Sequence, residues 1–240
     1  MPFLRNYMSY CLAIKVNEGL VFASDSRTNA GLDNVNTYSK MFTYNVGDRA
    51  FVILTAGNLA TSQAVYHQLE KDLNSENPEI NLNLCEDIEA AAQYIGRLSV
   101  SSSNQSLEVQ NQSSLMGSFF ILGGQIKDQE PNLLLIYPEG NFIEASEDTP
   151  FFQSGETKYG RPILVRAFDR NMTFEDAIKL LMVSFDSTIK ANLSVGPPLD
   201  INIYEIDSFK PPKSLRINAE NSYLQMVSKE WGHALRVSLN

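Results

Sequence analysis

Residues 9–27, which read SYCLAIKVNEGLVFASDSR, decide the fold of this chain. Two short apolar runs, residues 10–16 and 19–24, have the length and patterning that are typical of strands. Between them stands Asn17-Glu18, a polar pair suited to a tight turn. The stretch therefore predicts a β-hairpin with a polar residue, Ser9 or Asp25, at each outer end.

Three residues in and after this hairpin have the spacing of an N-terminal nucleophile. Ser9 begins the first strand, Asp25 follows the second, and Lys40 comes fifteen residues after Asp25. We expect the hydroxyl, the acid and the lysine to converge, because the ends of neighbouring antiparallel strands lie side by side. Such a nucleophile also needs a free α-amine. Met8 precedes a small residue, so its removal is the simplest way to expose that amine.

The composition narrows the classes of function. At 240 residues, with 43% hydrophobic residues, the chain is long enough to bury a full core. Its net charge of −9 argues against nucleic acid or an anionic membrane as a partner, since both attract clustered Lys and Arg. No apolar run approaches the roughly 18–20 residues that span a bilayer. Two cysteines and two histidines offer little for a disulfide framework or a metal site, so we expect a cytoplasmic protein without cofactor or metal.

The order of predicted elements indicates the fold class. Strands, helices, strands and helices follow one another in blocks, without the regular strand-helix alternation or the Gly-x-Gly-x-x-Gly of a Rossmann fold. This order favours an α+β fold in which two antiparallel sheets pack face to face with helices outside, a four-layer αββα sandwich. Further strands are expected at residues 50–55, 118–123, 132–137, 141–145 and 200–206.

Helices are expected where the apolar spacing changes to the helical period. The strongest pattern covers residues 173–192, with Thr173 and Asp176 as a capping-box-like start. Asn58 is a plausible N-cap for a second helix, whose stripe would be Leu59, Ala60, Ala64, Val65 and Leu69. Other helices are expected near residues 85–98, 158–168 and 222–237. Residues 101–114 are rich in Ser, Asn and Gln, and we interpret them as a mobile connection.

Several blocks of this sequence carry a resemblance to a known family. They are residues 9–11 and 39–41, the run GLVFASDSRTNAG at 19–31, GETKYGRPIL at 155–164 and NLSVGPP at 192–198. These blocks resemble proteasome β-type subunits, and more specifically the bacterial proteasome-related peptidases called Anbu (ancestral β-subunit). The resemblance covers nearly the whole chain from Met8 onward. It implies an N-terminal-nucleophile (Ntn) hydrolase fold, self-assembly into a ring or spiral of identical subunits, and hydrolysis of peptide or amide bonds without metal.

The groups available suggest a mechanism. Ser9 Oγ would attack the substrate carbonyl, and the Ser9 α-amine, with a reference pKa of roughly 8, would accept its proton. Lys40 would favour the developing alkoxide by its positive charge, and Asp25 would pair with Lys40 and hold it in place. Gly57 lies at a predicted strand-to-helix turn, where its N–H can face the oxyanion without obstruction by a Cβ.

Other site residues follow from the resemblance alone. Ser154 resembles the serine that positions the α-amine, and Asp186 and Ser194 are candidates for the same network. The family pattern places the acid and the serine three residues apart, whereas these two are eight apart. Proteasome-type enzymes carry threonine where this chain has Ser9, which keeps the hydroxyl but lacks the methyl group that restricts its rotamer. Lys40 also lies one residue nearer to the nucleophile than in typical β-subunits.

The start of the mature chain decides whether Ser9 can act in this way. We expect residues 1–8 to be a leader that is removed or not translated, with Met8 as the functional start, and residues 9–240 to form one domain. The leader lacks the glycine that usually precedes the nucleophile in self-cleaving precursors.

Two alternatives from other classes stay open. One is a catalytically inert, proteasome-like assembly subunit that keeps the fold. The other is an Ntn amidase that acts on a small acyl amide. The favoured interpretation is a self-assembling peptidase acting on peptides or unfolded protein, with neither nucleic acid nor membrane as a partner.

Overall fold

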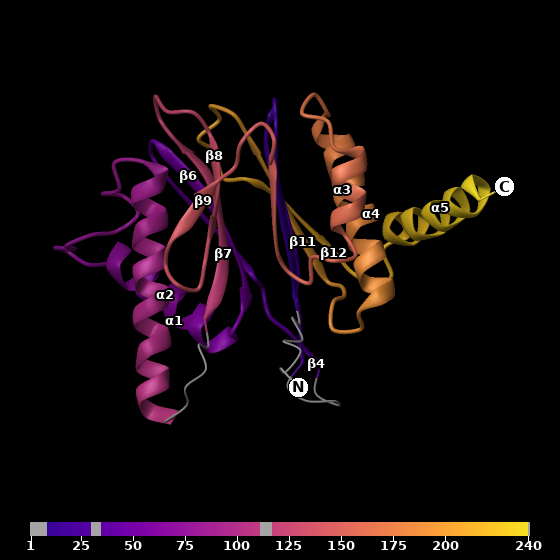
Figure 1. Cartoon of the computed structure of the whole chain (residues 1–240). Helices are drawn as coiled ribbons and strands as arrows, with labels where there is room; N and C mark the ends of the chain where they lie inside the picture. Colours follow the sequence, from indigo (N-terminus) through magenta and orange to yellow (C-terminus); the bar gives the residue numbers. More distant parts are fainter. Residues whose placement is uncertain (1–8, 30–34, 111–116, 240) are drawn as a thin grey trace.

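The computed structural model describes residues 9–29, 35–110 and 117–239 (Figure 1). The predicted leader at residues 1–8 and the end of the predicted connection, residues 111–114, lie outside the described residues. Among the residues that the structure describes, no helix is both long enough and apolar enough to cross a membrane.

The first sheet contains the hairpin that residues 9–27 predict. Its five strands are antiparallel and lie in the order β10-β1-β2-β11-β12. In the hairpin, Cys11 lies opposite Ser24 and Val16 opposite Gly19, which confirms the turn at Asn17-Glu18. The strands are β1 (Tyr10–Val16), β2 (Gly19–Asp25), β10 (Phe151–Gly155), β11 (Leu199–Glu205) and β12 (Lys213–Ile217).

The second sheet is an antiparallel meander in the order β5-β6-β7-β8-β9. A small separate pair, β3 (Arg27–Asn29) with β4 (Val35–Thr37), leads into it from β2. The strands of the meander are β5 (Met41–Val46), β6 (Arg49–Gly57), β7 (Ser118–Ile126), β8 (Asn132–Ile136) and β9 (Phe142–Glu144).

Helices cover the outer face of each sheet, so the predicted αββα sandwich is confirmed (Figure 1). One helical layer consists of α1 (Leu59–Leu73) and α2 (Ile88–Gln110), and the other of α3 (Arg161–Ala167) and α4 (Phe174–Ala191). The last helix, α5 (Ser222–Ser238), leaves this stack and projects away from α4.

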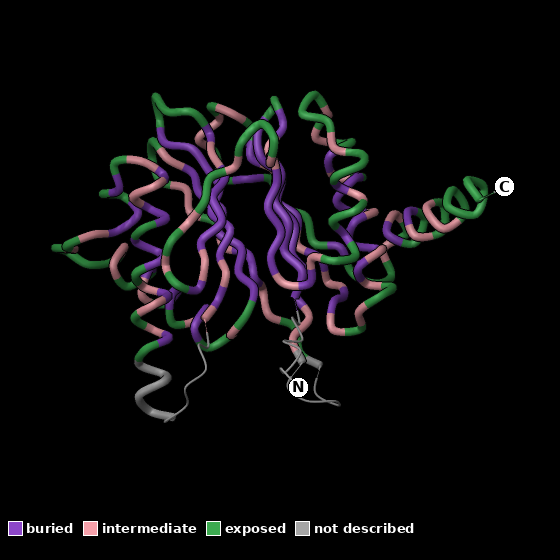
Figure 2. Tube along the Cα trace, viewed as in Figure 1, coloured by how far each residue is buried: buried purple, intermediate pink, exposed green. Residues whose placement is uncertain are grey.

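Three apolar clusters hold the four layers together. One packs the first sheet against α3 and α4, another packs the second sheet against α1 and α2, and the third fills the space between the sheets. The sheets are accordingly the most buried part of the chain (Figure 2). Phe22 is fully buried in the middle cluster, and a Cβ on Gly123 would lie 2.6 Å from its ring. The two sheets therefore meet without spare volume at this point.

The two predicted N-caps are confirmed. The Asn58 side chain accepts a hydrogen bond from the Thr61 N–H at 3.0 Å, and Thr173 Oγ1 accepts one from the Asp176 N–H at 3.2 Å. Each cap satisfies one of the backbone donors that a helix leaves free at its start. The caps set where α1 leaves β6 and where α4 begins.

The predicted buried face of α1 is confirmed at Val65 and Leu69 and wrong at the start of the helix. Leu59, Ala60 and Ala64 are exposed, and the buried face instead includes Thr61 and Ser62. The hydroxyl of Ser62 finds buried partners in Thr55 and Ser118, which removes the cost of burying it.

The predicted connection at residues 101–114 was also wrong as far as residue 110, because α2 continues to Gln110. Extending a formed helix costs little per residue, and Ser99 and Ser103 are buried on its inner side. The strands β10 and β12 were not predicted, since their apolar runs are short.

We expect Phe22→Ala to lower the free energy of unfolding by about 3–5 kcal/mol, because it leaves a cavity between the sheets. Urea denaturation followed by fluorescence measures the change. Leu215→Ala on β12, where the leucine side chain is exposed, is the matched control and should change stability by about 0.5 kcal/mol or less. Equal losses in both variants would contradict this account of the core.

Candidate active site

A buried ion pair marks the end of the hairpin. Lys40 Nζ, just before β5, donates to Asp25 Oδ1 at 2.7 Å, and both side chains are almost completely buried. Lys40 Nζ also donates to the backbone carbonyl of Arg27 at 2.7 Å. The pair therefore joins β2, β3 and the start of β5 at one point between the sheets.

The same carboxylate holds the start of β1. Asp25 Oδ1 accepts the Tyr10 N–H at 2.9 Å in addition to the Lys40 ammonium. Ser9, directly before Tyr10, is 8% exposed, and its carbonyl accepts the Glu156 N–H at 2.8 Å. The backbone at Ser9 is thus fixed on both sides, by Asp25 and by the segment after β10.

Opposing effects act on the Asp25 carboxyl. Burial raises its pKa above the usual value, while the Lys40 ammonium and the Tyr10 N–H lower it by binding the ionised form. A buried ion pair is tolerated only when further hydrogen bonds satisfy both groups. The bonds from Tyr10 and to the Arg27 carbonyl meet that requirement in part, because Asp25 Oδ2 is buried and has no hydrogen-bond partner among the described residues.

The end of β6 lies against this centre. The Thr55 N–H donates to the Lys40 carbonyl at 3.0 Å, and the Cys11 thiol donates to the Thr55 carbonyl at 3.2 Å. Gly57, two residues further on, closes β6 with a φ of +128°, a conformation that favours glycine. A Cβ there would lie 2.9 Å from the carbonyl oxygen of Gly117, so the neighbouring backbone also requires glycine.

Ser154 belongs to the same buried surface. It lies on β10 directly opposite Cys11, and its side chain projects from the same face of the sheet. Its hydroxyl is buried beside the Cys11 thiol, whose pKa it lowers, and makes no regular hydrogen bond within the described part of the chain. A buried hydroxyl in that state is available to another polar group.

The other two predicted residues lie on α4 and after it. Asp186 borders a groove between α4 and α5, with Trp231 on the far side. Ser184, two residues earlier, hydrogen-bonds the Tyr10 hydroxyl, and residues two apart on a helix point in nearly opposite directions. Asp186 therefore lies on the side of α4 away from Ser184, the side chain through which the helix contacts Tyr10 of β1. Ser194 is half-buried in the loop after α4, with its N–H donating to Asn192 Oδ1 at 2.9 Å.

Arg27, Glu156 and Asn192 anchor this loop, and none of them was predicted to belong to the site. Arg27 donates to the Leu193 carbonyl at 2.8 Å, and a Cβ on Gly196 would lie 2.6 Å from the Arg27 guanidinium carbon. Asn192 donates to Glu156 Oε2 at 3.1 Å. These contacts tie the loop to β3 and to the segment that binds Ser9. Glu156 directly follows β10, so only a prediction that β10 pairs with β1 would have placed it beside Ser9.

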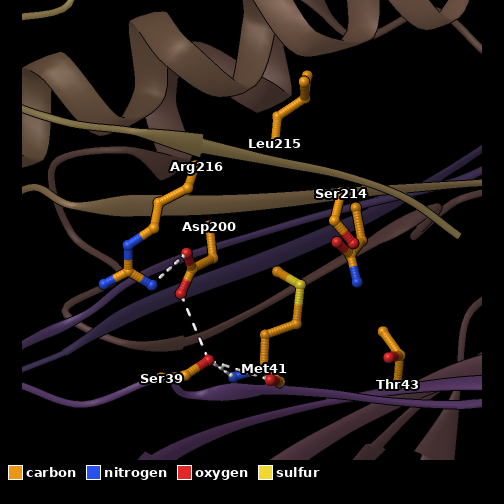
Figure 3. A pocket seen from close by; sticks show the side chains of 8 residues that line it. Ser39, Met41, Thr43, Asp200, Ser214, Leu215 and Arg216 are labelled. Carbon is orange, nitrogen blue, oxygen red and sulfur yellow. Dashed lines mark hydrogen bonds and ion pairs between the residues drawn. The ribbon is translucent and has the colours of Figure 1, made fainter.

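A cavity of about 260 Å³ opens between the two sheets beside Ser39 (Figure 3). Asp200 on β11 is its charged centre: it accepts from Arg216 at 2.9 Å and from Ser39 Oγ at 3.4 Å. Burial raises the pKa of Asp200, and the Arg216 guanidinium acts in the opposite direction. As far as the structure describes the chain, the lining includes none of the Ser9, Asp25 and Lys40 side chains.

The assembled groups suit hydrolysis through a nucleophile. A buried cation with its counter-ion lies next to the backbone that carries Ser9, and Gly57 ends the strand whose Thr55 N–H binds the Lys40 carbonyl. Over the described ranges, no three His, Cys, Asp or Glu side chains cluster as they would around a metal ion.

Comparison with known proteins agrees with this architecture. The profile of the family described as "Proteasome subunit" matches residues 9–203. Proteasome subunit beta 2 of Pyrobaculum calidifontis is 25% identical over 196 residues, which cover 81% of this chain and 87% of that protein.

Solved structures give closer matches. A mutant Anbu from Hyphomicrobium sp. strain MC1 is 43% identical, with a TM-score of 0.89 and 96% of each chain covered. Anbu from Yersinia bercovieri is 40% identical, with a TM-score of 0.88 and the same coverage. The helical assembly of the Anbu complex from Pseudomonas aeruginosa is 40% identical, with a TM-score of 0.90, covering 96% of this chain and 95% of that one. The chain therefore belongs to the proteasome β-subunit family and, within it, to the Anbu proteins.

Proposed function

We propose that this protein is a proteasome-type peptidase that uses Ser9, freed as the first residue, as its nucleophile. The observation that carries the proposal is the shared oxygen Asp25 Oδ1, which binds both Lys40 Nζ and the Tyr10 N–H. This oxygen holds a cation beside the backbone that carries Ser9. Family membership makes hydrolysis the expected chemistry of such a centre.

The reaction follows in two stages. Ser9 Oγ adds to the peptide carbonyl while its proton passes to the α-amine, and Lys40 stabilises the negative charge that develops. The amide C–N bond then breaks, the leaving amine takes the proton from the α-ammonium, and an ester remains on Ser9. Water adds to that ester with the α-amine again as base, which releases the acid and restores the Ser9 hydroxyl.

Gly57 is the proposed oxyanion donor. N–H groups two residues apart on a strand point to the same side, and the Thr55 N–H points to Lys40. The Gly57 N–H is therefore expected to point beyond the beginning of β5, toward the side where Lys40 lies.

Ser154 and Ser194 are proposed to hold the α-amine. The Ser154 hydroxyl is buried on the face of the sheet that Cys11 shares, and no described residue binds it. Ser194 lies in the loop that Arg27 anchors. Asp186 was expected to belong to this network, but its position along the groove with α5 gives that role no support.

The proposed substrate is peptide or unfolded protein, and the proposed working form is a homo-oligomer. The Anbu complex from Pseudomonas aeruginosa forms a helical assembly, and the match to its subunit covers 96% of this chain. We also propose a cytoplasmic location, in keeping with two buried cysteines that form no disulfide.

Ser9→Ala is expected to abolish both peptide hydrolysis and covalent labelling by a β-lactone, since no hydroxyl remains to be acylated. Fluorogenic peptides and intact mass measure the two effects in protein whose first residue is residue 9. Ser9→Thr is the matched control and should keep both, because it retains the hydroxyl. A processed wild-type protein that forms no adduct would favour the inert subunit, and a monomer that cleaves only small amides would favour the amidase.

Lys40→Met is expected to reduce kcat/KM at least about 100-fold and to lower the free energy of unfolding by about 3–5 kcal/mol, because Asp25 loses its buried cation. The double variant Asp25→Asn with Lys40→Met removes both charges. It should regain part of the stability without regaining activity. Recovery of hydrolysis in the double variant would contradict the role given to Lys40.

Cys11 does not compete with Ser9 as the nucleophile. Its side chain is fully buried, its thiol is bound to the Thr55 carbonyl, and burial raises its pKa to about 12. Only a thiolate is a strong nucleophile, and at neutral pH almost none forms under these conditions.

Iodoacetamide at pH 7.5 should therefore leave Cys11 unmodified in the native protein and alkylate it after denaturation. Peptide mapping by mass spectrometry measures the modification. Hydrolysis by the iodoacetamide-treated enzyme should equal that of the untreated enzyme. Rapid labelling of Cys11 together with loss of activity would point to a thiol enzyme instead.

A further inference from the structure

The pairing of β1 with β10 extends one residue beyond the strands. Tyr10 lies opposite Gly155, so the next pair in the antiparallel register is Ser9 with Glu156. The Glu156 N–H donates to the Ser9 carbonyl at 2.8 Å, which shows that this pair is joined. Gly155 permits the close approach, since its φ is +85° and a Cβ there would lie 2.0 Å from the Ser9 carbonyl oxygen.

The direction of the Ser9 nitrogen follows from this pairing. In an antiparallel ladder, a residue whose carbonyl binds one neighbouring strand also points its nitrogen toward that strand. The next N–H, of Tyr10, points the other way and binds Asp25 on β2. The nitrogen of Ser9 therefore points toward the main chain of Glu156, and the side chains of this directly opposed pair stand on the same face of the sheet.

The Glu156 side chain is held in place at this position. The residue is 8% exposed, as is Ser9. Its Oε2 accepts the Asn192 amide at 3.1 Å, and its Oε1 accepts the Lys158 N–H at 3.4 Å. Asn192 in turn receives the N–H of Ser194. A nearly buried carboxylate with only neutral donors among its recorded bonds is well placed to receive a cation.

We infer that Glu156 is the positioning residue for the Ser9 α-amine: its carboxylate, which rises on the face of the sheet that the Ser9 side chain shares, orients the free amine and stabilises the ammonium that forms when Oγ gives up its proton. This inference rests on the proposed function, in which Ser9 carries the free α-amine. The amine is the base, and Glu156 acts through it by raising its pKa.

The neighbouring charges do not replace Glu156. Lys40 and Asp25 neutralise each other at 2.7 Å. Arg27 is directed to the loop after α4, and the contact that Lys158 makes with Glu156 is through its backbone N–H. Asp186 borders the groove with α5. Glu156 is therefore the acid whose removal should change the α-amine most.

The test is the pKa of the α-amine in Glu156→Gln and in wild-type protein, both with Ser9 verified as the first residue by intact mass. Competitive acetylation with acetic anhydride at a series of pH values, read by mass spectrometry, gives that pKa. We expect Glu156→Gln to lower it by about one unit, because a nearby negative charge favours the ammonium form. Since the neutral amine is the base, the acid limb of kcat/KM should move to lower pH by the same amount.

Two further variants separate charge from structure. Glu139→Gln, in the exposed turn between β8 and β9, is the matched control and should leave the pKa unchanged. Asn192→Ala removes the amide that donates to Glu156 Oε2 but keeps the negative charge of Glu156. The pKa of the Ser9 α-amine in this variant should therefore stay close to that of wild type. Equal shifts in Glu156→Gln and Asn192→Ala would mean that Glu156 only holds the loop, and would overturn the inference.

An unchanged α-amine pKa in Glu156→Gln would also overturn it. If that variant does not fold, Glu156→Asp, which draws the carboxylate back by one methylene, should lower the pKa by a smaller amount, and no change there would be equally decisive. Acetylation reports on the amine whether or not the protein cleaves peptides. A wild-type protein without hydrolysis would therefore refute the proposed function while the acetylation result still decides the role of Glu156.

Discussion

One carboxylate oxygen, Asp25 Oδ1, organises the centre of this protein. It accepts the Lys40 ammonium and the Tyr10 N–H, and so connects β1, β2 and the entry to β5. Removing two charges from water costs several kcal/mol for each ion, so the pair depends on the further bonds that each partner makes. Lys40 is bound by the β3 carbonyl and Asp25 Oδ1 by the Tyr10 N–H, while Asp25 Oδ2 is buried without a partner among the described residues. The charge next to Ser9 therefore depends on how the two sheets pack.

The same requirement explains the loop between α4 and β11. Ser26 donates through both its N–H and its hydroxyl to the Pro198 carbonyl, and Arg27 binds the Leu193 carbonyl. These bonds fasten the loop to the two residues that directly follow Asp25. A shift of the loop would therefore disturb the ion pair as well as Ser194, and helix α4 is coupled to the centre through its C-terminal end.

The sequence predicted the parts of the structure that depend on neighbours in the chain. The hairpin and the caps at Asn58 and Thr173 are local, since their partners lie within a few residues. The first turn of α1 was mispredicted because the partner hydroxyl of Ser118, which allows Ser62 to be buried, lies 56 residues from it. Glu156 was missed for a similar reason. It lies far from Ser9 in the sequence, and only the pairing of β10 with β1 makes the two residues neighbours.

The position of Ser9 at the very start of β1 gives a physical reason for placing the base there. Its carbonyl is already bound by the Glu156 N–H, so the residue stays anchored when its own nitrogen changes from an amide to an amine. In the proposed mechanism, the free amine would carry its positive charge beside Glu156, whose recorded bonds are from the Asn192 amide and the Lys158 N–H. The base and the acid that stabilises its protonated form would then be held together by the pairing of β1 with β10.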